Sequence, residues 1–245
     1  MSTVVEGVPQ EEVDEGGTKL TVLEHLEELR QRLIYSAIGV AATTLISFIF
    51  TKQLLIFLKE PAGTVEFITI EATEGFSTYF KVAFFSGLGL GLPMLLFQAI
   101  MFLAPGLTRK ERSYLRYLLP GSVVCFVLGV LFAYYVALPP ALRFLIPFLQ
   151  DIATPQIRIG EYVTFVTTLL FWTGVVFETP IVIFFLAKLH IVNYKMLAKN
   201  RKFALLGAFV ISAIITPSPD PMTQIVVAIP LLALYEAGIW LARIA

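Results

Sequence analysis

Long apolar runs recur along the whole chain, and they limit its possible folds more than any other feature of the sequence. A hydrocarbon core about 30 Å thick needs about 20 apolar residues for each helix that crosses it, and the chain supplies such runs repeatedly. Hydrophobic residues make up 57% of the sequence and charged residues only 15%, which is far more apolar than a typical soluble protein. We therefore expect an all-α integral membrane protein.

The runs predict six transmembrane helices, over residues 33–58, 76–103, 115–138, 162–186, 203–216 and 224–241. The last two are short, and the prolines Pro217, Pro219 and Pro221 lie between them. This pattern predicts a hairpin that crosses the membrane where the bilayer is thinned. A re-entrant or merely buried segment is the alternative for the run 203–216.

Three prolines lie inside the apolar runs, namely Pro93, Pro120 and Pro180. Each removes one backbone donor and tends to kink its helix, so the helices are expected to form a concave bundle. The alternative is ordinary membrane-helix proline, which neighbouring helices tolerate.

Lysine and arginine residues are distributed unequally between the two ends of these helices. Thirteen flank one side, and the other side has five: Lys52, Lys59, Lys81, Arg143 and Arg158. Because basic residues are retained in cytoplasmic loops, the asymmetry predicts a multi-pass protein of the cytoplasmic (inner) membrane with both termini in the cytoplasm.

The chain begins with a polar, acidic stretch, and its first apolar run starts only near Leu33. Residues 1–19 are therefore expected to be a disordered tail rather than a secretory signal peptide. Basic and acidic residues are equal at 18 each, which gives no reason to expect a nucleic-acid partner. The single cysteine, Cys125, excludes an intrachain disulfide and a cysteine-based metal site.

Residues 20–32 predict an amphipathic helix at the cytoplasmic surface that runs into the first transmembrane helix. Thr21 and Glu24 form a capping box at its start. Glu28 lies on an acidic face, which is unusual beside a membrane surface. The simplest account of Glu28 is an ion pair with Arg32 four residues later.

Glu111 is a lone acid in the basic loop that follows Pro105 and Gly106. It could simply neutralise its neighbours. On the same membrane face as Glu28, however, it could complete a pair of carboxylates, each able to take one guanidinium in a bidentate pair that lysine cannot reproduce.

Glu178 lies deep in the run 162–186. An ionisable group at that depth is a functional candidate, which usually faces a cavity or a partner. Lys81 and Glu236 lie nearer their helix ends, where a structural role is expected. Helix capping explains Asp220 and Gln224 without a function.

Motifs along residues 20–243 resemble those of the TatC family, the membrane subunits of the twin-arginine protein translocase. The residues that carry the resemblance are His25 to Leu33 in the N-terminal motif; Lys81, Pro93 and Gln98 in the second helix; Phe102, Pro105, Gly106, Leu107 and Glu111 in the first cytoplasmic loop; Gly174, Phe177, Glu178 and Pro180 in the fourth helix; and Thr216, Pro217, Asp220, Gln224, Pro230, Tyr235 and Glu236 in the last hairpin.

The resemblance implies a glove-shaped six-helix domain that binds twin-arginine signal peptides of folded precursors. It implies that Glu28 and Glu111 contact the arginines, and that Phe102 and Arg30 belong to the same site. It implies that Glu178 and Gln224 face partner helices. The residues with an implied supporting role are Pro61, Lys81, Pro93, Gln98, Pro105, Asp220 and Glu236.

The implied partners are the membrane helices of TatA and TatB, the signal peptides, the lipid bilayer and further copies of the chain. Transport would be driven by the proton-motive force, and neither a cofactor nor an enzymatic activity is expected.

Two other functions fit part of the sequence. A proton- or ion-coupled small-solute transporter would also suit Glu178 and kinked helices, but no paired repeats are visible. An intramembrane protease is a weaker alternative, because His25 and His190 are the only histidines and no nucleophile or zinc motif occurs.

Overall fold

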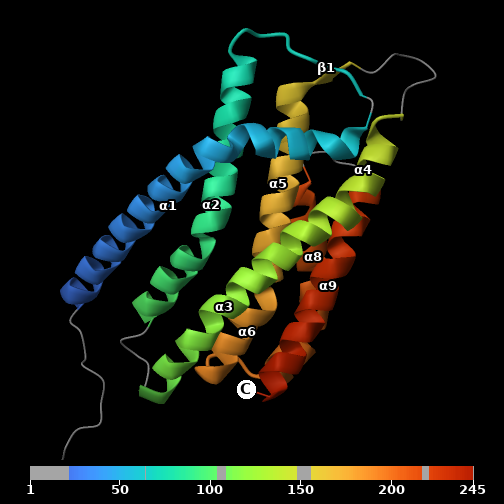
Figure 1. Cartoon of the computed structure of the whole chain (residues 1–245). Helices are drawn as coiled ribbons and strands as arrows, with labels where there is room; N and C mark the ends of the chain where they lie inside the picture. The colour runs from blue at the N-terminus through green and yellow to red at the C-terminus, as the bar shows by residue number, and fades with distance from the viewer. Residues whose placement is uncertain (1–21, 64, 104–108, 148–155, 217–220, 245) are drawn as a thin grey trace, which may run out of the picture.

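The computed structural model describes residues 22–63, 65–103, 109–147, 156–216 and 221–244. These residues are almost entirely helical (Figure 1). The helices are α1 (Val22–Lys59), α2 (Glu74–Leu103), α3 (Arg109–Phe132), α4 (Leu138–Leu145), α5 (Ile159–Phe177), α6 (Thr179–Lys188), α7 (Tyr194–Lys199), α8 (Arg201–Ile215) and α9 (Pro221–Ile244). The expected tail over residues 1–19, Pro105 and Asp220 lie outside the described residues.

Five stretches of the described chain are long and apolar enough to cross a membrane: Leu23–Ala62, Glu74–Phe102, Leu119–Leu145, Ile159–Lys188 and Thr223–Ile244. The sixth crossing segment is α8, whose 15 residues span only about 22 Å. Its partner α9 has 24 residues and is longer than the expected range 224–241. The helix is longer because Pro221 fits a first helical turn and the helix continues past the apolar run through Arg243. The predicted all-α membrane bundle is thus confirmed.

The stretch 20–32 and the first transmembrane segment belong to one continuous helix, α1. Only 11% of its most apolar window is buried, against 33–39% in the other four spans, so α1 lies at the edge of the bundle. It packs mainly on α2. At their crossing, a Cβ added to Gly87 would lie 2.4 Å from Thr44 Cα, so only glycine fits there.

Prolines shape the other helices. After α3, the π-helical turn η3 (Ala133–Ala137) leads into α4, because Pro139 and Pro140 cannot donate the usual backbone bonds. The helix expected over 115–138 therefore continues to Leu145. Pro93 lies inside α2 and leaves that helix unbroken.

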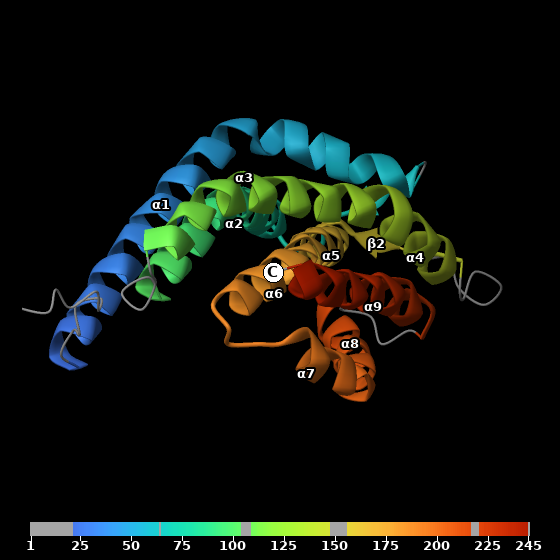
Figure 2. The ribbon, with the colours of Figure 1, turned by 90° about the horizontal axis from the view of Figure 1, so that it is seen from below.

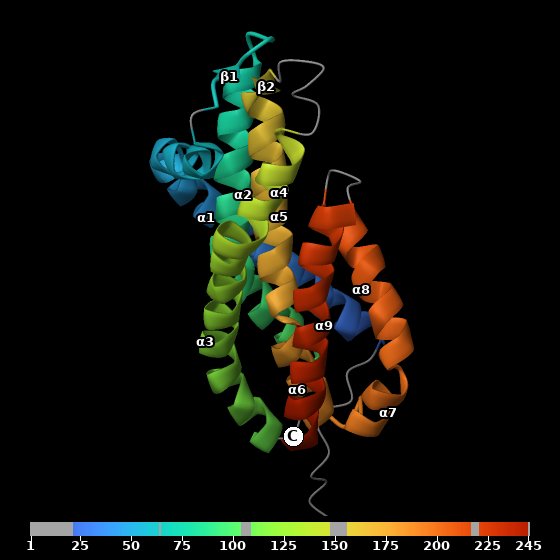
Figure 3. The ribbon, with the colours of Figure 1, turned by 90° about the vertical axis from the view of Figure 1, so that its right-hand side faces the viewer.

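The helix expected over 162–186 is divided at Glu178 into α5 and α6. Pro180 has no N–H to offer the preceding turn, and the Glu178 N–H bonds the Val175 carbonyl at 3.1 Å instead. α5 is the central helix, with α2, α3, α8 and α9 packed around it (Figure 3). Seen along the bundle, α1 and α3 form an arch above α5, α6 and α9, which gives the molecule its curved, glove-like outline (Figure 2).

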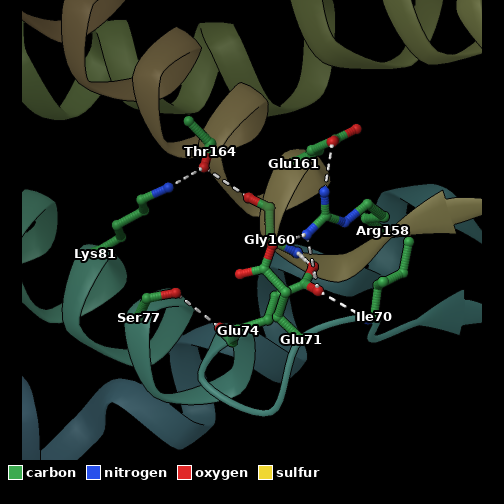
Figure 4. Close-up of polar contacts among 9 residues, drawn as sticks. All are labelled: Ile70, Glu71, Glu74, Ser77, Lys81, Arg158, Gly160, Glu161 and Thr164. Carbon is green, nitrogen blue, oxygen red and sulfur yellow. Dashed lines mark hydrogen bonds and ion pairs between the residues drawn. The ribbon is translucent and has the colours of Figure 1, made fainter.

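At one end of the bundle the chain forms the 3-10 turn η1 (Glu60–Ala62), which contains Pro61, and a short parallel pair of strands, β1 (Phe67–Ile68) and β2 (Ile157–Arg158). Glu74, only 5% exposed, holds the two strand segments together (Figure 4). Its carboxylate accepts hydrogen bonds from Ile70 N at 3.0 Å, Gly160 N at 3.0 Å and Arg158 Nη2 at 3.3 Å. The hydrogen bond to Glu74 raises the pKa of the Arg158 guanidinium above its ordinary value, so this pair remains ionised.

Candidate functional site

A polar and aromatic cluster lies between α1 and α2, at the end of the bundle opposite the short strands. Its members, named here the α1–α2 cluster, are His25, Glu28, Arg32, Gln98 and Phe102. Residues three or four apart share one face of a helix. The spacing within each helix therefore directs all of these side chains toward the α1–α2 interface.

Glu28 and Arg32 form the ionic part of the cluster. Arg32 donates from Nε to Glu28 Oε1 at 3.0 Å and also from Nη2 to the same oxygen. Its Nη1 donates to Gln98 Oε1 at 3.3 Å, which connects the pair to α2. The pairing of Glu28 with Arg32 that the sequence suggested is thus present in the structure.

The second carboxylate oxygen of Glu28, Oε2, forms fewer contacts than Oε1. Oε2 is buried and accepts no hydrogen bond from the described residues. His25 Nδ1 lies 3.9 Å from this oxygen. The Glu28 side chain as a whole is 22% exposed although Oε2 itself is covered, so an incoming donor must first displace the atoms that cover it.

His25 and Phe102 form the aromatic part of the cluster. Their rings stack at 4.3 Å between centroids and 18° between planes. A flat aromatic surface beside a carboxylate suits a planar cation, because a guanidinium can stack on the ring and donate to the oxygen at once.

Arg30 and Glu111 were assigned to the same site from the family resemblance. Arg30 is exposed, and no hydrogen bond or ion pair joins it to the described members of the α1–α2 cluster. Glu111 lies in the first turn of α3, which begins at the same end of the bundle as the cluster (Figure 1). The contacts of its side chain lie outside the described part of the chain.

Glu178 and Gln224 are held within the chain itself. Glu178 is 3% exposed and accepts a hydrogen bond from Ser122 Oγ of α3 at 3.0 Å. Its other oxygen has no hydrogen-bond partner among the described residues. Gln224 donates from Nε2 to the Phe209 carbonyl at 3.0 Å and so ties α9 to α8.

The two charged residues with an expected structural role both contact a neighbouring helix. Lys81 Nζ donates to Thr164 Oγ1 of α5 at 2.9 Å. Glu236 of α9 pairs with Arg201 of α8, with 2.7 Å between Oε2 and Nη2. Each contact joins consecutive or adjacent helices.

Sequence reasoning missed two functional candidates, His25 as a ring partner and Ser122 as the donor to Glu178. His25 stands three residues before Glu28, so helical spacing alone could have placed it on the same face. Ser122 carries no comparable signal, because a hydroxyl in an apolar run does not reveal which helix it faces.

Known proteins resemble this chain both in sequence and in fold. Residues 24–230 match the family described as Sec-independent protein translocase protein (TatC). A TatC of Carboxydothermus hydrogenoformans is 39% identical over 226 residues, which cover 91% of this chain and 93% of the relative. A TatC of Aquifex aeolicus is 40% identical over 232 residues, covering 92% and 96%.

Two crystal structures of a twin arginine translocase receptor, TatC, resemble the fold over most of its length. One superposes with a TM-score of 0.79 and 40% identity, covering 90% of this chain and 99% of the other. The second, determined in DDM, superposes with a TM-score of 0.81 and 41% identity. It covers 89% of this chain and 99% of the other.

Proposed function

Because this chain belongs to the TatC family of Sec-independent protein translocase proteins, we propose that its α1–α2 cluster receives the arginines of twin-arginine signal peptides. The chain is a multi-pass membrane component of that translocase. Family membership therefore favours protein transport over the small-solute transporter that the sequence alone left open.

The observation that carries the proposal is the state of Glu28. Its Oε2 atom is buried, lacks a hydrogen bond from any described residue and lies beside the stacked rings of His25 and Phe102. A guanidinium can donate to this oxygen while it stacks on Phe102. A lysine ammonium is more strongly hydrated and has no planar face to stack on the ring, so it fits this arrangement less well.

A pair of arginines needs a second acid, and Glu111 is our candidate. Its position in the first turn of α3 puts its backbone at the same end of the bundle as Glu28. The exposed Arg30 is assigned to the rim of the site, where it would keep its charge in water.

The remaining assignments concern partners and orientation. Glu178 retains a carboxylate oxygen for a donor on a TatA or TatB helix, and Gln224 lies at the α8–α9 contact where a second partner helix could bind. The excess of basic residues at one end supports our assignment of that end, with Glu28, Glu111 and both termini, to the cytoplasm.

Capture of a precursor tests the arginine site directly. Glu28→Ala and Glu111→Ala should each reduce retention of an Arg-Arg precursor by about tenfold, as expected for loss of a charge-assisted hydrogen bond. A Lys-Lys signal should bind the unaltered protein poorly. Glu27→Ala is the matched control, since Glu27 is an exposed neighbour on α1 and should retain nearly full capture.

Full capture by both Glu28→Ala and Glu111→Ala would show that the arginines bind elsewhere. Equal capture of Arg-Arg and Lys-Lys signals would show that the site attracts positive charge without recognising the guanidinium group. Solute flux through the chain alone in liposomes would instead support the small-solute transporter function.

A further inference from the structure

A polar cavity of about 460 Å³ opens between α2 and α5, at the end of the bundle that carries the short strands. The signal-peptide proposal makes no use of it. Its lining includes the acids Glu71, Glu74 and Glu161 and the cations Lys81 and Arg158 (Figure 4). The cavity therefore presents charges of both signs at the point where two membrane helices begin.

The charges are not equally available to a ligand. Arg158 is surrounded by carboxylates, with Nη2 3.3 Å from Glu74 Oε2 and Nη1 3.4 Å from Glu161 Oε1. Lys81 has no carboxylate within 4.0 Å among the described residues, and it donates one hydrogen bond, to Thr164. An ammonium has three donors, so Lys81 keeps two for a ligand.

Glu71 and Glu161 both contact Arg158, so together with Glu74 three carboxylates share one guanidinium and the outer edge keeps an excess of negative charge. The charges also differ in depth. Lys81 lies seven residues into α2 from Glu74, which is about 10 Å further along the helix toward the membrane interior. Glu71 and Glu161 lie at the outer edge and are 68% and 73% exposed. A ligand that fits both ends must carry an anionic group on its membrane side and a cationic group on its water side.

Gly160 lets the start of α5 pack closely against α2 at the edge of the cavity. A Cβ at this position would lie 2.9 Å from Glu74 Oε1 and 3.3 Å from Thr78 Oγ1. Glycine therefore keeps Glu74 and Arg158 in place beside the cavity, and it leaves no further space there.

We propose that this cavity binds the headgroup of a phosphatidylethanolamine lipid, with the phosphate on Lys81 and the ammonium between Glu71 and Glu161. In this lipid the phosphate is attached nearer the acyl chains and the amine lies further out, which matches the order of charges along the cavity. Phe165 lines the inner wall and gives the glycerol region an apolar surface.

The same arrangement disfavours the other common headgroups. Phosphatidylglycerol offers a phosphate to Lys81 but no cation to the acidic rim. Phosphatidylcholine has a quaternary ammonium without N–H groups, so it loses the charge-assisted hydrogen bonds to Glu71 and Glu161.

Native mass spectrometry of the purified chain in detergent tests the proposal, with the three lipids carrying identical acyl chains. Phosphatidylethanolamine should bind about tenfold more tightly than the other two, as expected for one additional charge-assisted contact. Lys81→Gln should weaken the binding of all three lipids, because each of them presents a phosphate to Lys81. Lys52→Gln is the control, because Lys52 is an exposed lysine of α1 outside the cavity lining.

A second variant separates a loss of lipid binding from misfolding, in case Lys81→Gln does not fold. Glu161 is largely exposed, so Glu161→Gln should leave the thermal unfolding of the lipid-free protein unchanged and still bring phosphatidylethanolamine close to phosphatidylcholine. Equal binding of all three lipids, or tightest binding of phosphatidylglycerol, would overturn the proposal. So would displacement of the lipid by an equal concentration of soluble glycerophosphoethanolamine, which would identify a site for a free metabolite.

Discussion

Glu74 and Glu178 are both buried carboxylates, but they differ in the number of donors that reach them. Glu74 accepts from two backbone amides and from Arg158. Glu178 accepts from Ser122 alone among the described residues. Buried polar groups are stable only when they are hydrogen-bonded, so Glu74 suits a structural role and Glu178 has capacity for a further partner.

The difference predicts how Glu178 variants behave. If Glu178 accepts a hydrogen bond from a TatA or TatB helix as we propose, Glu178→Ala should weaken crosslinking from α6 to that helix. Glu178→Gln should be milder, since the amide can still accept. Hydrogen bonds between membrane helices average below about 1 kcal/mol, so neither variant should unfold the protein.

Site-directed crosslinking in membranes that contain all three subunits measures this effect, with Ser122→Ala as the control for loss of the internal bond alone. Unchanged crosslinking and transport in Glu178→Ala would remove the partner role. Unchanged crosslinking with lost transport would point to a hydration or protonation role instead.

The sequence indicated Glu178 as a candidate from depth alone, since an acid in an apolar run differs from all of its surroundings. It could not predict Ser122 as the donor, because that contact depends on how α3 and α5 cross. It offered the Glu28–Arg32 pair only as one alternative, and helical spacing cannot say whether two neighbouring charges point together.

At the scale of elements, hydropathy located the membrane segments but not their breaks. The run 162–186 contains no charged residue except Glu178, yet it forms α5 and α6. The break follows from Pro180, whose effect on a helix depends on whether neighbouring groups satisfy the freed carbonyls. The same dependence on neighbouring groups explains why Pro93 leaves α2 unbroken while Pro139 and Pro140 accompany a π-helical turn.

The crossing of α1 and α2 gives a prediction at this scale. Gly87→Ala should lower the free energy of unfolding by about 1–3 kcal/mol, because its Cβ would meet the backbone of Thr44 and force the helices apart. Gly75→Ala is the matched control in the same helix, since nothing lies within 4 Å of a Cβ there. Thermal unfolding in detergent compares the two. Equal stability of Gly87→Ala and the unaltered chain would contradict the close crossing.

At the scale of the whole molecule, the first helix begins and the last helix ends at the same end of the bundle (Figure 1). From the charge asymmetry we propose that this end faces the cytoplasm. In a Cys125→Ala background, cysteines that replace Glu66 or Gln156 should therefore react with an impermeant maleimide in sealed cells. A cysteine at Lys199 should react only after permeabilisation. Labelling of the Lys199 position from outside would invert the topology.

The overall architecture was largely predictable, because a membrane allows few arrangements of apolar helices. The α1–α2 cluster and the cavity beside Lys81 were not, since each joins residues from helices whose contact no periodicity encodes. Glu74 and Arg158, which are 84 positions apart, meet only when α2 and α5 lie side by side.

Arg32 already occupies part of the site that we assign to an incoming arginine. In the proposed complex the incoming arginine takes Oε2 of Glu28 while Arg32 keeps Oε1, so two guanidinium groups share one carboxylate. Such a receptor carries its own competitor, which limits affinity and hastens dissociation once the peptide loosens. A translocase that must release each cargo before accepting the next gains turnover from this arrangement, because Arg32 still pairs with Glu28 after every precursor departs.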